Sequence, residues 1–233
     1  MKFALVNGKR THINDVPKGT IGYDCWFNEY KVKACKGHFM QYWKYADSHP
    51  VLPKGYENET EWHQCWKSVI KDEYCEVVCG ENKEHRADIL TNDYTIEIQY
   101  SPIEYETALE RTKFYFKLKG NRTIWIVNAY KPYANNYIIT ELDKEDKERK
   151  RFFVKWKYPK KWAVDISHLK NANVFLDISP TARNLILLWK HKNILYGQWV
   201  LKNKFFSDYL KSYSNCINNF EDIFKNLNLK DYL

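Results

Sequence analysis

Two acidic residues and one glutamine stand out in the segment HRADILTNDYTIEIQYS, which spans residues 85–101. Asp88, Glu97 and Gln99 lie there among apolar and β-branched residues that are typical of strands. Carboxylates bind hard divalent cations such as Mg²⁺, which keep further positions open for water and for phosphate oxygens. A cation of this kind lowers the pKa of a bound water and stabilises charge that develops on a phosphate. These residue types therefore indicate metal-dependent hydrolysis of a phosphodiester bond.

The turn between the two strands decides whether these side chains meet. The dipeptide at 92–93 is Asn-Asp, which tolerates positive φ and favours a two-residue hairpin turn. This register places Asp88 opposite Glu97, with Cβ atoms about 4.5–5.5 Å apart on one face, and Gln99 follows on that face. Two opposed carboxylates repel each other unless a cation lies between them. Alternatively, they are surface carboxylates held by salt bridges, for example to Arg86, and the spacing alone leaves both interpretations open.

A helix is expected to bring further side chains to this hairpin. The segment ETEWHQCWKSVIKD, residues 59–72, has apolar residues at helical spacing, and Asn58 is a suitable N-cap. Glu59, His63 and Lys67 follow at i, i+4 and i+8 and form one row beside the apolar stripe. If that stripe packs on the sheet, Glu59 and His63 reach the edge of the same cleft. Alternatively, Glu59 and Lys67 are surface charges and His63 is a structural histidine.

Strand and helix signals then follow in a regular order. Strands are predicted at 73–79, 85–90 and 94–101, a helix at 103–118 and a nearly all-apolar strand at 123–130. Together with the first helix, these elements give the order αβββαβ, which predicts a mixed α/β core. Later segments indicate strands at 173–179 and 184–190 and helices at 205–213 and 218–233.

The charge of the chain indicates a polyanionic partner. Across 233 residues the formal net charge is +8, the pI is near 9.0 and 17% of the residues are aromatic, a composition that favours nucleic acid. The segment 144–162 carries nine Lys or Arg residues against three acidic ones, interleaved with aromatic rings. Lys155 and Lys157 are predicted to contact phosphates there, while the rings stack on unpaired bases. A solvated charged loop is an equally weighted interpretation.

Targeting segments and paired cysteines are not visible in the sequence. No signal-peptide core and no run of about 18 apolar residues occurs, so we expect a cytoplasmic protein without a membrane partner. The six cysteines form no C-x-x-C pair. A zinc site from Cys25, Cys35 and either His38 or His49 would lack closely spaced ligand pairs, so structural Zn²⁺ is not expected. Free, buried thiols are the default in a reducing compartment.

Five short blocks occur in order and at suitable spacing: ETEWHQCWK, HRADIL, TIEIQYSPI, ERTKFY and IWIVN. They span roughly residues 57–130 and resemble the nuclease core of the competence protein CoiA family, which is part of the PD-(D/E)XK nuclease superfamily. The resemblance implies an α/β, restriction-endonuclease-like core with the order αβββαβ and a mixed sheet at 56–135. We expect a small β-rich module at 1–55 before it and a basic C-terminal extension, also α/β, at 136–233.

The same resemblance implies roles for the residues of the hairpin. Asp88 and Glu97 would hold the metal, together with Ile98. Gln99 would take the place of the lysine in the superfamily's usual acidic-x-Lys signature. Because an amide carries no charge, water activation would depend more on the metal.

The resemblance also implies supporting residues on both predicted helices. The helix acid is Glu59 or Glu61, and the helical geometry favours Glu59. Lys67 or His63 would help in water activation. The resemblance assigns His63, Ser101, Arg111 and Tyr115 to support of the site or to phosphate contact. Lys67 is a further candidate for nucleic-acid binding.

The predicted function is that of a Mg²⁺- or Mn²⁺-dependent nuclease that hydrolyses DNA, in the processing of incoming DNA or in recombination. The alternative is a nucleic-acid-binding protein that keeps a nuclease fold without cleaving. An RNase or a repair-type nuclease is a third candidate. The joint presence of Asp88, Glu97 and Gln99 favours an enzyme, and the sequence leaves the oligomeric state open.

Overall fold

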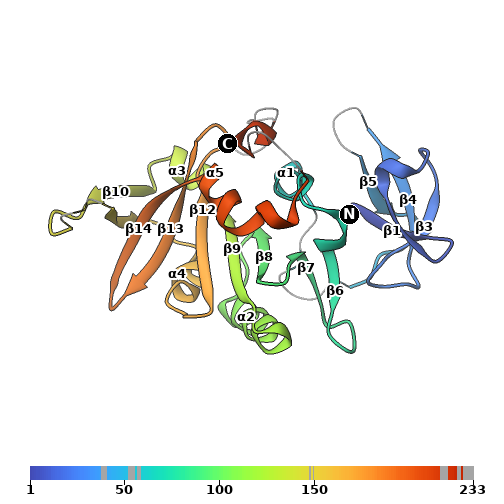
Figure 1. Ribbon diagram of the computed structural model, residues 1–233, viewed down its shortest axis with the longest axis horizontal. Helices are drawn as coiled ribbons and strands as arrows, with labels where there is room; N and C mark the ends of the chain where they lie inside the picture. Colours follow the sequence, from blue (N-terminus) through green and yellow to red (C-terminus); the bar gives the residue numbers. More distant parts are fainter. Residues whose placement is uncertain are drawn as a thin grey trace.

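The computed structural model describes residues 1–37, 41–51, 56, 59–146, 148, 150–215, 220–224 and 227. The chain forms a small five-stranded antiparallel sheet and a large nine-stranded mixed sheet (Figure 1). The small sheet has the order β2-β1-β3-β4-β5 and comprises β1 (Phe3–Val6), β2 (Lys9–His12), β3 (Ile21–Tyr23), β4 (Lys31–Lys36) and β5 (Gln41–Tyr45). The N–H of Trp43 donates to the carbonyl of Met1 at 3.0 Å, so this sheet curves back on itself.

The large sheet has the order β10-β11-β14-β13-β12-β9-β8-β7-β6. The pairs β8–β9 and β9–β12 are parallel, and the other neighbours are antiparallel. Its strands are β6 (Cys75–Cys79), β7 (His85–Leu90), β8 (Tyr94–Gln99), β9 (Arg122–Asn128), β10 (Ile138–Leu142), β11 (Arg151–Trp156), β12 (Ala172–Asp177), β13 (Asn184–His191) and β14 (Ile194–Leu201).

The helices are short except for α2. They are α1 (Glu61–Ser68), α2 (Tyr105–Lys119), α3 (Tyr130–Ala134), α4 (Lys161–Ile166) and α5 (Lys202–Phe205). Single turns occur at η1 (Ile13–Asp15), η2 (Asp72–Tyr74), η3 (Phe206–Leu210), η4 (Lys211–Tyr213) and η5 (Phe220–Phe224). Within the described residues, no helix is both long and apolar enough to cross a membrane.

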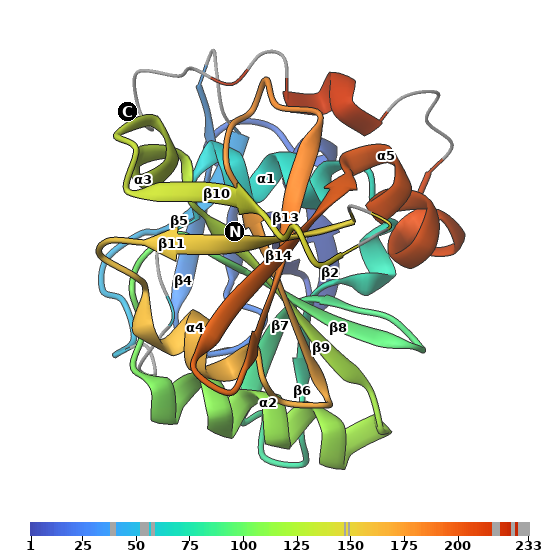
Figure 2. The same ribbon diagram turned by 90° about the vertical axis from the view of Figure 1, so that its left-hand side faces the viewer.

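Helices cover both faces of the large sheet (Figures 1 and 2). Along β9, Ile124 and Ile126 pack in the cluster that contains side chains of α1, α5 and η5, whereas Trp125 and Val127 pack in the cluster that contains side chains of α2 and α4. A parallel strand that is buried on both faces is apolar at nearly every position. This explains why the segment around β9 lacks the alternation of a half-exposed strand.

The predicted succession αβββαβ is confirmed by α1, β6, β7, β8, α2 and β9. Strands β10 to β14 extend the same sheet, so hydrogen bonding is continuous across the domain boundary predicted near residue 135. The division into 1–55, 56–135 and 136–233 stays a prediction.

The hairpin register is also confirmed. The N–H of Thr91 donates to the carbonyl of Tyr94 at 2.9 Å, and Ile89 pairs with Ile96. These contacts enclose a two-residue turn. Asp88 therefore lies opposite Glu97, as the sequence predicted.

The predicted start of the first helix is wrong. Thr60 is the N-cap of α1, because its hydroxyl oxygen accepts the N–H of His63 while the His63 ring accepts the N–H of Thr60. This reciprocal capping box begins the helix at Glu61. Glu59 therefore precedes the helix instead of starting the predicted row, and Asn58 lies outside the described residues.

The basic segment 144–162 contains a strand and a short helix that its many charged residues did not predict. In β11, Phe152, Val154 and Trp156 are buried, while Lys155 between them is exposed. This alternation is typical of a strand with one wet face. Trp162 and Ile166 of α4 then pack in the apolar cluster beneath the sheet.

Candidate active site

A cavity of about 390 Å³ lies between β5 of the small sheet and strands β6, β7 and β8 of the large sheet. The predicted catalytic and metal-binding residues that line it are Glu59, His63, Asp88, Glu97, Ile98 and Gln99. Lys67 and Arg111 line it as well. Two strands, two helices and the segment before α1 thus bring these residues together, while their chemical roles remain predictions.

Three carboxylates form a row across the end of the large sheet. The β6–β7 register places Glu76 opposite Asp88, and the β7–β8 register places Asp88 opposite Glu97. Backbone pairing between β6 and β7 skips the first of these positions, and pairing between β7 and β8 ends just before the second. Glu76 has a φ of +48°, which a residue with a side chain adopts only when its surroundings compensate the strain. The Asp88 carboxylate accepts the N–H of Ile98 at 2.9 Å, so a side chain replaces a carbonyl of the ladder.

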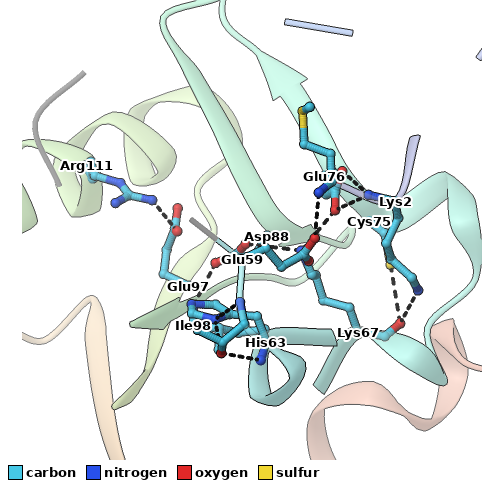
Figure 3. Close-up of polar contacts among 12 residues, drawn as sticks. Lys2, Glu59, His63, Lys67, Cys75, Glu76, Asp88, Glu97, Ile98 and Arg111 are labelled. Atoms are coloured by element: carbon cyan, nitrogen blue, oxygen red, sulfur yellow. Dashed lines mark hydrogen bonds and ion pairs between the residues drawn. The ribbon is translucent and has the colours of Figure 1, made fainter. Parts of the chain in front are cut away.

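Lys67 of α1 neutralises one end of this row (Figure 3). Its Nζ lies 3.0 Å from Glu76 Oε1 and 3.7 Å from Asp88 Oδ1, and it also pairs with Glu59. Burial alone would lower the pKa of Lys67, but these three carboxylates outweigh burial and raise that pKa. Conversely, burial would raise the pKa of Glu59 and of Glu76, yet the Lys67 ammonium holds both pKa values below the ordinary range. Lys67 therefore remains a cation and accepts no proton at neutral pH.

Glu97 at the other end of the row pairs with Arg111 of α2. Nη2 of Arg111 donates to Oε2 of Glu97, and both side chains are buried. Burial raises the pKa of Glu97 to about 7; Arg111 opposes this change and the Asp88 charge adds to it. Oε1 of Glu97 is buried and has no hydrogen-bond partner of ordinary geometry within the residues that the structure describes, although the buried Tyr115 hydroxyl lies near enough to lower the pKa of Glu97. Glu97 thus has one oxygen fixed by an arginine and a second oxygen without a donor.

Gln99 is oriented by the chain that follows β8. Its Nε2 donates to the carbonyl of Ser101 at 3.0 Å, and the side chain is buried at the cavity wall. Ser101 does not line the cavity and contributes this carbonyl. The amide therefore has a defined orientation at the position where the superfamily signature has a lysine.

The capping box at the start of α1 also fixes the His63 ring beside the cavity. Glu59 lines the cavity and Glu61 does not. The geometry therefore favours Glu59 over Glu61, as predicted, but the reason differs. Glu59 reaches the cavity from the extended segment before the helix, and its carboxylate is held by Lys67 and, at 2.9 Å, by the amino group of Met1.

Three other predicted nucleic-acid-binding residues lie away from the cavity. Tyr115 is fully buried and does not line the cavity, but its hydroxyl lies beside Glu97 and lowers the pKa of that carboxyl, a position that suits support of the hairpin. Nζ of Lys155 lies 2.6 Å from a carboxylate oxygen of Glu141, and Nζ of Lys157 lies 5.3 Å from the ring centre of Tyr158. Five steps of strand order separate β11 from β8, or about 24 Å at the usual strand spacing. The structure therefore does not bring Lys155 and Lys157 to this site.

Glu76 was not among the predicted site residues, and Arg86 was only an alternative partner for the carboxylates. Glu76 lies within the predicted strand 73–79, and the β6–β7 register would have revealed it if the turn at 80–84 had been placed. Arg86 lines the cavity, but within the described residues it forms no ion pair with the row. Its guanidinium carbon lies 5.4 Å from the ring centre of Trp26, and Lys67 and Arg111 serve as the counter-ions instead.

The donor set fits one divalent cation between β7 and β8. Asp88 and Glu97 line one cavity, and the Asp88 charge raises the pKa of Glu97, so the two carboxylates interact. Oε1 of Glu97 offers a buried oxygen without a donor. Across the described part of the chain, no three His, Cys, Asp or Glu side chains form a metal-binding group. Water and phosphate oxygens would therefore supply the remaining ligands, as Mg²⁺ sites allow.

Of the residues of the zinc alternative, Cys25, Cys35 and His49 lie in the small sheet or in the segments next to it. Cys25 and Cys35 are free thiols, and His38 lies outside the described residues. Burial raises the pKa of the Cys25 thiol to about 11.

A second buried charge centre lies on the other side of α1, at the end of β12. Oδ2 of Asp177 accepts hydrogen bonds from Trp62 Nε1 at 2.9 Å, Trp66 Nε1 at 3.3 Å and Tyr130 Oη at 3.1 Å. Oδ1 of Asp177 lies 3.0 Å from Nζ of Lys202, and both side chains are fully buried. This centre holds α1, which carries His63 and Lys67, against the sheet.

Residues 73–150 match the family model described as "Competence protein CoiA, nuclease-like domain". The match supports a CoiA-like family assignment, and it includes the hairpin and Arg111 but not α1. No curated protein and no solved structure matches the chain.

Proposed function

Taking the CoiA-like, nuclease-like domain at 73–150 as the premise, we propose that this protein is a metal-dependent nuclease of the PD-(D/E)XK type that hydrolyses phosphodiester bonds in DNA. One observation carries the proposal: Asp88 and Glu97 reach one cavity from adjacent strands, and Glu97 keeps a buried oxygen without a donor. The order α1, β6, β7, β8, α2, β9 supports the same class of nuclease.

A bound Mg²⁺ or Mn²⁺ supplies Lewis-acid chemistry, because it lowers the pKa of a water and neutralises charge on the scissile phosphate. Asp88 and Glu97 would hold that ion. The N–H of Ile98 orients Asp88, and the Arg111 guanidinium orients Glu97 through Oε2. The protein thereby presents two fixed carboxylates, each with a separate anchor.

The positive charge of the site comes from Lys67 and Arg111, since Gln99 is neutral. Lys67 stays protonated, so its role is to hold Asp88 and to add positive potential to the cavity where the phosphate binds. Gln99 has an amide oriented by Ser101 and offers a hydrogen bond rather than a charge. In this account proton transfer does not pass through Lys67.

The second candidate, a binder that does not cleave, is favoured by a different observation. The protein's own cations already occupy both ends of the carboxylate row, Lys67 at Glu76 and Arg111 at Glu97. A site neutralised in this way is stable without a metal. A nuclease must accept a further cation there; a binding protein need not.

Cleavage of single-stranded, double-stranded and nicked DNA, and of RNA, with Mg²⁺ or Mn²⁺ tests the proposal. The variants Asp88→Asn and Glu97→Gln should lose at least about 100-fold in rate, since even partners that only support metal ligands cost up to that much. Asp208→Asn, at an exposed pair with Lys204, is the matched control and should retain the rate.

Two outcomes would reject the nuclease proposal. If the wild type cleaves no substrate with either cation but binds nucleic acid, the non-cleaving binder is correct. If Asp88→Asn cleaves as fast as Asp208→Asn, the activity resides elsewhere.

A further inference from the structure

The outer face of the small sheet has a packed half and an open half. On the packed half, Arg10 of β2 donates to the carbonyls of Asp72 and Cys75 at 2.9 and 2.6 Å, beside β6. On the open half, β3, β4 and β5 expose their outward side chains to solvent. We call this open half the β3–β5 face; its residues are Ile21, Tyr23, Lys31, Lys33, Tyr42 and Lys44.

Strand register places like charges side by side on the β3–β5 face. Lys33 pairs with Ile21 on one side and with Lys44 on the other, and Lys31 pairs with Tyr23. Directly opposed residues share a face, and opposed like charges destabilise a sheet. Lys33 and Lys44 are exposed, and neither has an ion-pair partner within the part of the chain that the structure describes. An anionic ligand would remove this repulsion.

The face continues directly into the candidate active site. Tyr42 and Lys44 of β5 line the cavity that contains Asp88 and Glu97. Lys44 is therefore both the last lysine of the row on the sheet and a residue of the cavity wall. Lys44 thereby joins the β3–β5 face to the cavity that contains the two carboxylates.

The basic strand β11 near the far edge of the large sheet lacks both properties of the β3–β5 face: its lysine has an ion-pair partner, and it lies far from the cavity. Lys155 of β11 has its own carboxylate, Glu141 on β10, at 2.6 Å, and lies about 24 Å from β8. The small-sheet region, residues 1–51, instead carries eight Lys or Arg residues against four Asp or Glu residues, so half of the chain's net charge of +8 resides there. Charge complementarity therefore favours the β3–β5 face as the nucleic-acid surface.

We propose that the β3–β5 face binds single-stranded nucleic acid and leads it along β5 into the cavity at Asp88 and Glu97. The proposal rests on the proposed nuclease function and names its substrate form and its binding surface. Lys31, Lys33 and Lys44 contact phosphates, and the exposed ring of Tyr23 and the half-buried ring of Tyr42 provide stacking surfaces for unpaired bases. Lysines and rings alternate in this way on proteins that bind single strands without sequence preference.

Fluorescence anisotropy with a labelled single-stranded oligonucleotide in EDTA tests the binding surface separately from cleavage. The double variant Lys33→Gln, Lys44→Gln should reduce the slope of log affinity against log salt by about 1.4, because each lost contact with a single strand removes about 0.7. At about 50 mM salt this corresponds to roughly 60-fold weaker binding. The melting temperature should stay the same or rise, since a like-charge pair is removed.

A matched control removes the same charge elsewhere. Lys117→Gln, Lys119→Gln changes two exposed lysines at the end of α2 and should leave the affinity within about two-fold, because uncontacted charges add little to the salt slope. Tyr23→Ser should weaken binding about 5-fold or more if a base stacks there. If duplex DNA binds more tightly, and the two substitutions change its slope of log affinity against log salt by nearer 1.8, the ligand of this face is duplex and not single-stranded nucleic acid.

Unchanged affinity in the Lys33→Gln, Lys44→Gln variant would overturn the proposal, as would a larger loss in Lys155→Gln, Lys157→Gln. The result is separable from the nuclease test. Loss of binding in the small-sheet variant, with no cleavage by the wild type, would support the surface and reject the enzyme. Cleavage that depends on Asp88 but not on Lys33 or Lys44 would support the enzyme and reject the surface.

Discussion

Asp177 and Glu97 are both buried carboxylates beside a cation, yet their surroundings differ. Asp177 has Lys202 on one oxygen and three donors on the other, and no part of the pair reaches solvent. Glu97 has Arg111 on one oxygen, no donor on the other within the described residues, and a position in a cavity wall. Burial raises the pKa of Glu97 to about 7.

The difference shows how a structural carboxylate can be distinguished from one that awaits a ligand. Burial and an ion pair are common to both centres, so neither property indicates function. At Asp177 one oxygen accepts three hydrogen bonds, and the other, which accepts none within the described residues, lies 3.0 Å from the Lys202 ammonium. Both oxygens are therefore compensated, which stabilises the packing of α1. An oxygen without a donor at Glu97 costs stability until a cation or proton arrives, which is the property expected of a binding site.

The largest expected effect on stability comes from breaking the ion pair of Asp177 with Lys202. Asp177→Ala leaves Lys202 buried without its counter-ion and should lower the free energy of unfolding by about 3–5 kcal/mol, measured by urea denaturation. The matched control is Asp165→Ala at the surface pair with Lys190, where we expect at most about 1 kcal/mol. Equal costs at the two positions would show that the buried centre does not stabilise the fold.

A smaller and pH-dependent effect is expected at Glu97 when EDTA removes metal. Its ordinary pKa is 4.5, and in the fold burial raises its pKa to about 7. Between these values the unfolded chain has lost a proton that the folded chain keeps, so stability falls as the pH rises. Relative to Glu97→Gln, the wild type should lose about 3 kcal/mol of unfolding free energy from pH 4.5 to 7 and remain level above it.

Urea denaturation of both proteins across this pH range gives the measurement. A divalent cation should restore the lost stability of the wild type at pH 7 and leave Glu97→Gln unchanged. A difference between the two proteins that stays flat with pH, or increases, would show that Glu97 is ionised in the fold like an ordinary glutamate.

The smallest expected effect concerns α1, which touches both centres. Thr60→Ala removes the hydroxyl that caps the helix and should lower the free energy of unfolding by about 1 kcal/mol, measured by thermal or urea denaturation. Because His63 loses its reciprocal partner, cleavage should fall by more than this stability change explains. Thr60→Ser, which keeps the hydroxyl, should restore both quantities; a variant that restores neither would show that the cap is irrelevant.

The hairpin at 85–99 could be predicted from sequence because residues close together in the chain determine it. The turn at 92–93 fixes the register, and the register fixes which face Asp88 and Glu97 share. The helix start could not be predicted as well, because both Asn58 and Thr60 are suitable caps. The choice depends on the reciprocal bond with His63, which spacing alone does not reveal.

The long-range partners could not be predicted for a physical reason. The counter-ions Lys67 and Arg111 reach the row from two helices on opposite faces of the sheet, and their contacts depend on how each helix packs. Local charge patterns instead suggested Lys155 as a phosphate contact and left Arg86 as an alternative partner of the carboxylates. The contribution of β5 to the cavity likewise depends on how the small sheet meets the large one.

The central claim is that Asp88 and Glu97 bind one divalent cation between adjacent strands, and a crystal soaked with Mn²⁺ tests it most directly. The account predicts one anomalous density peak in the cavity, in contact with an oxygen of Asp88 and with Oε1 of Glu97, and its absence in a Glu97→Gln crystal. A cavity without a peak, or a peak bound only by other residues, would contradict the account.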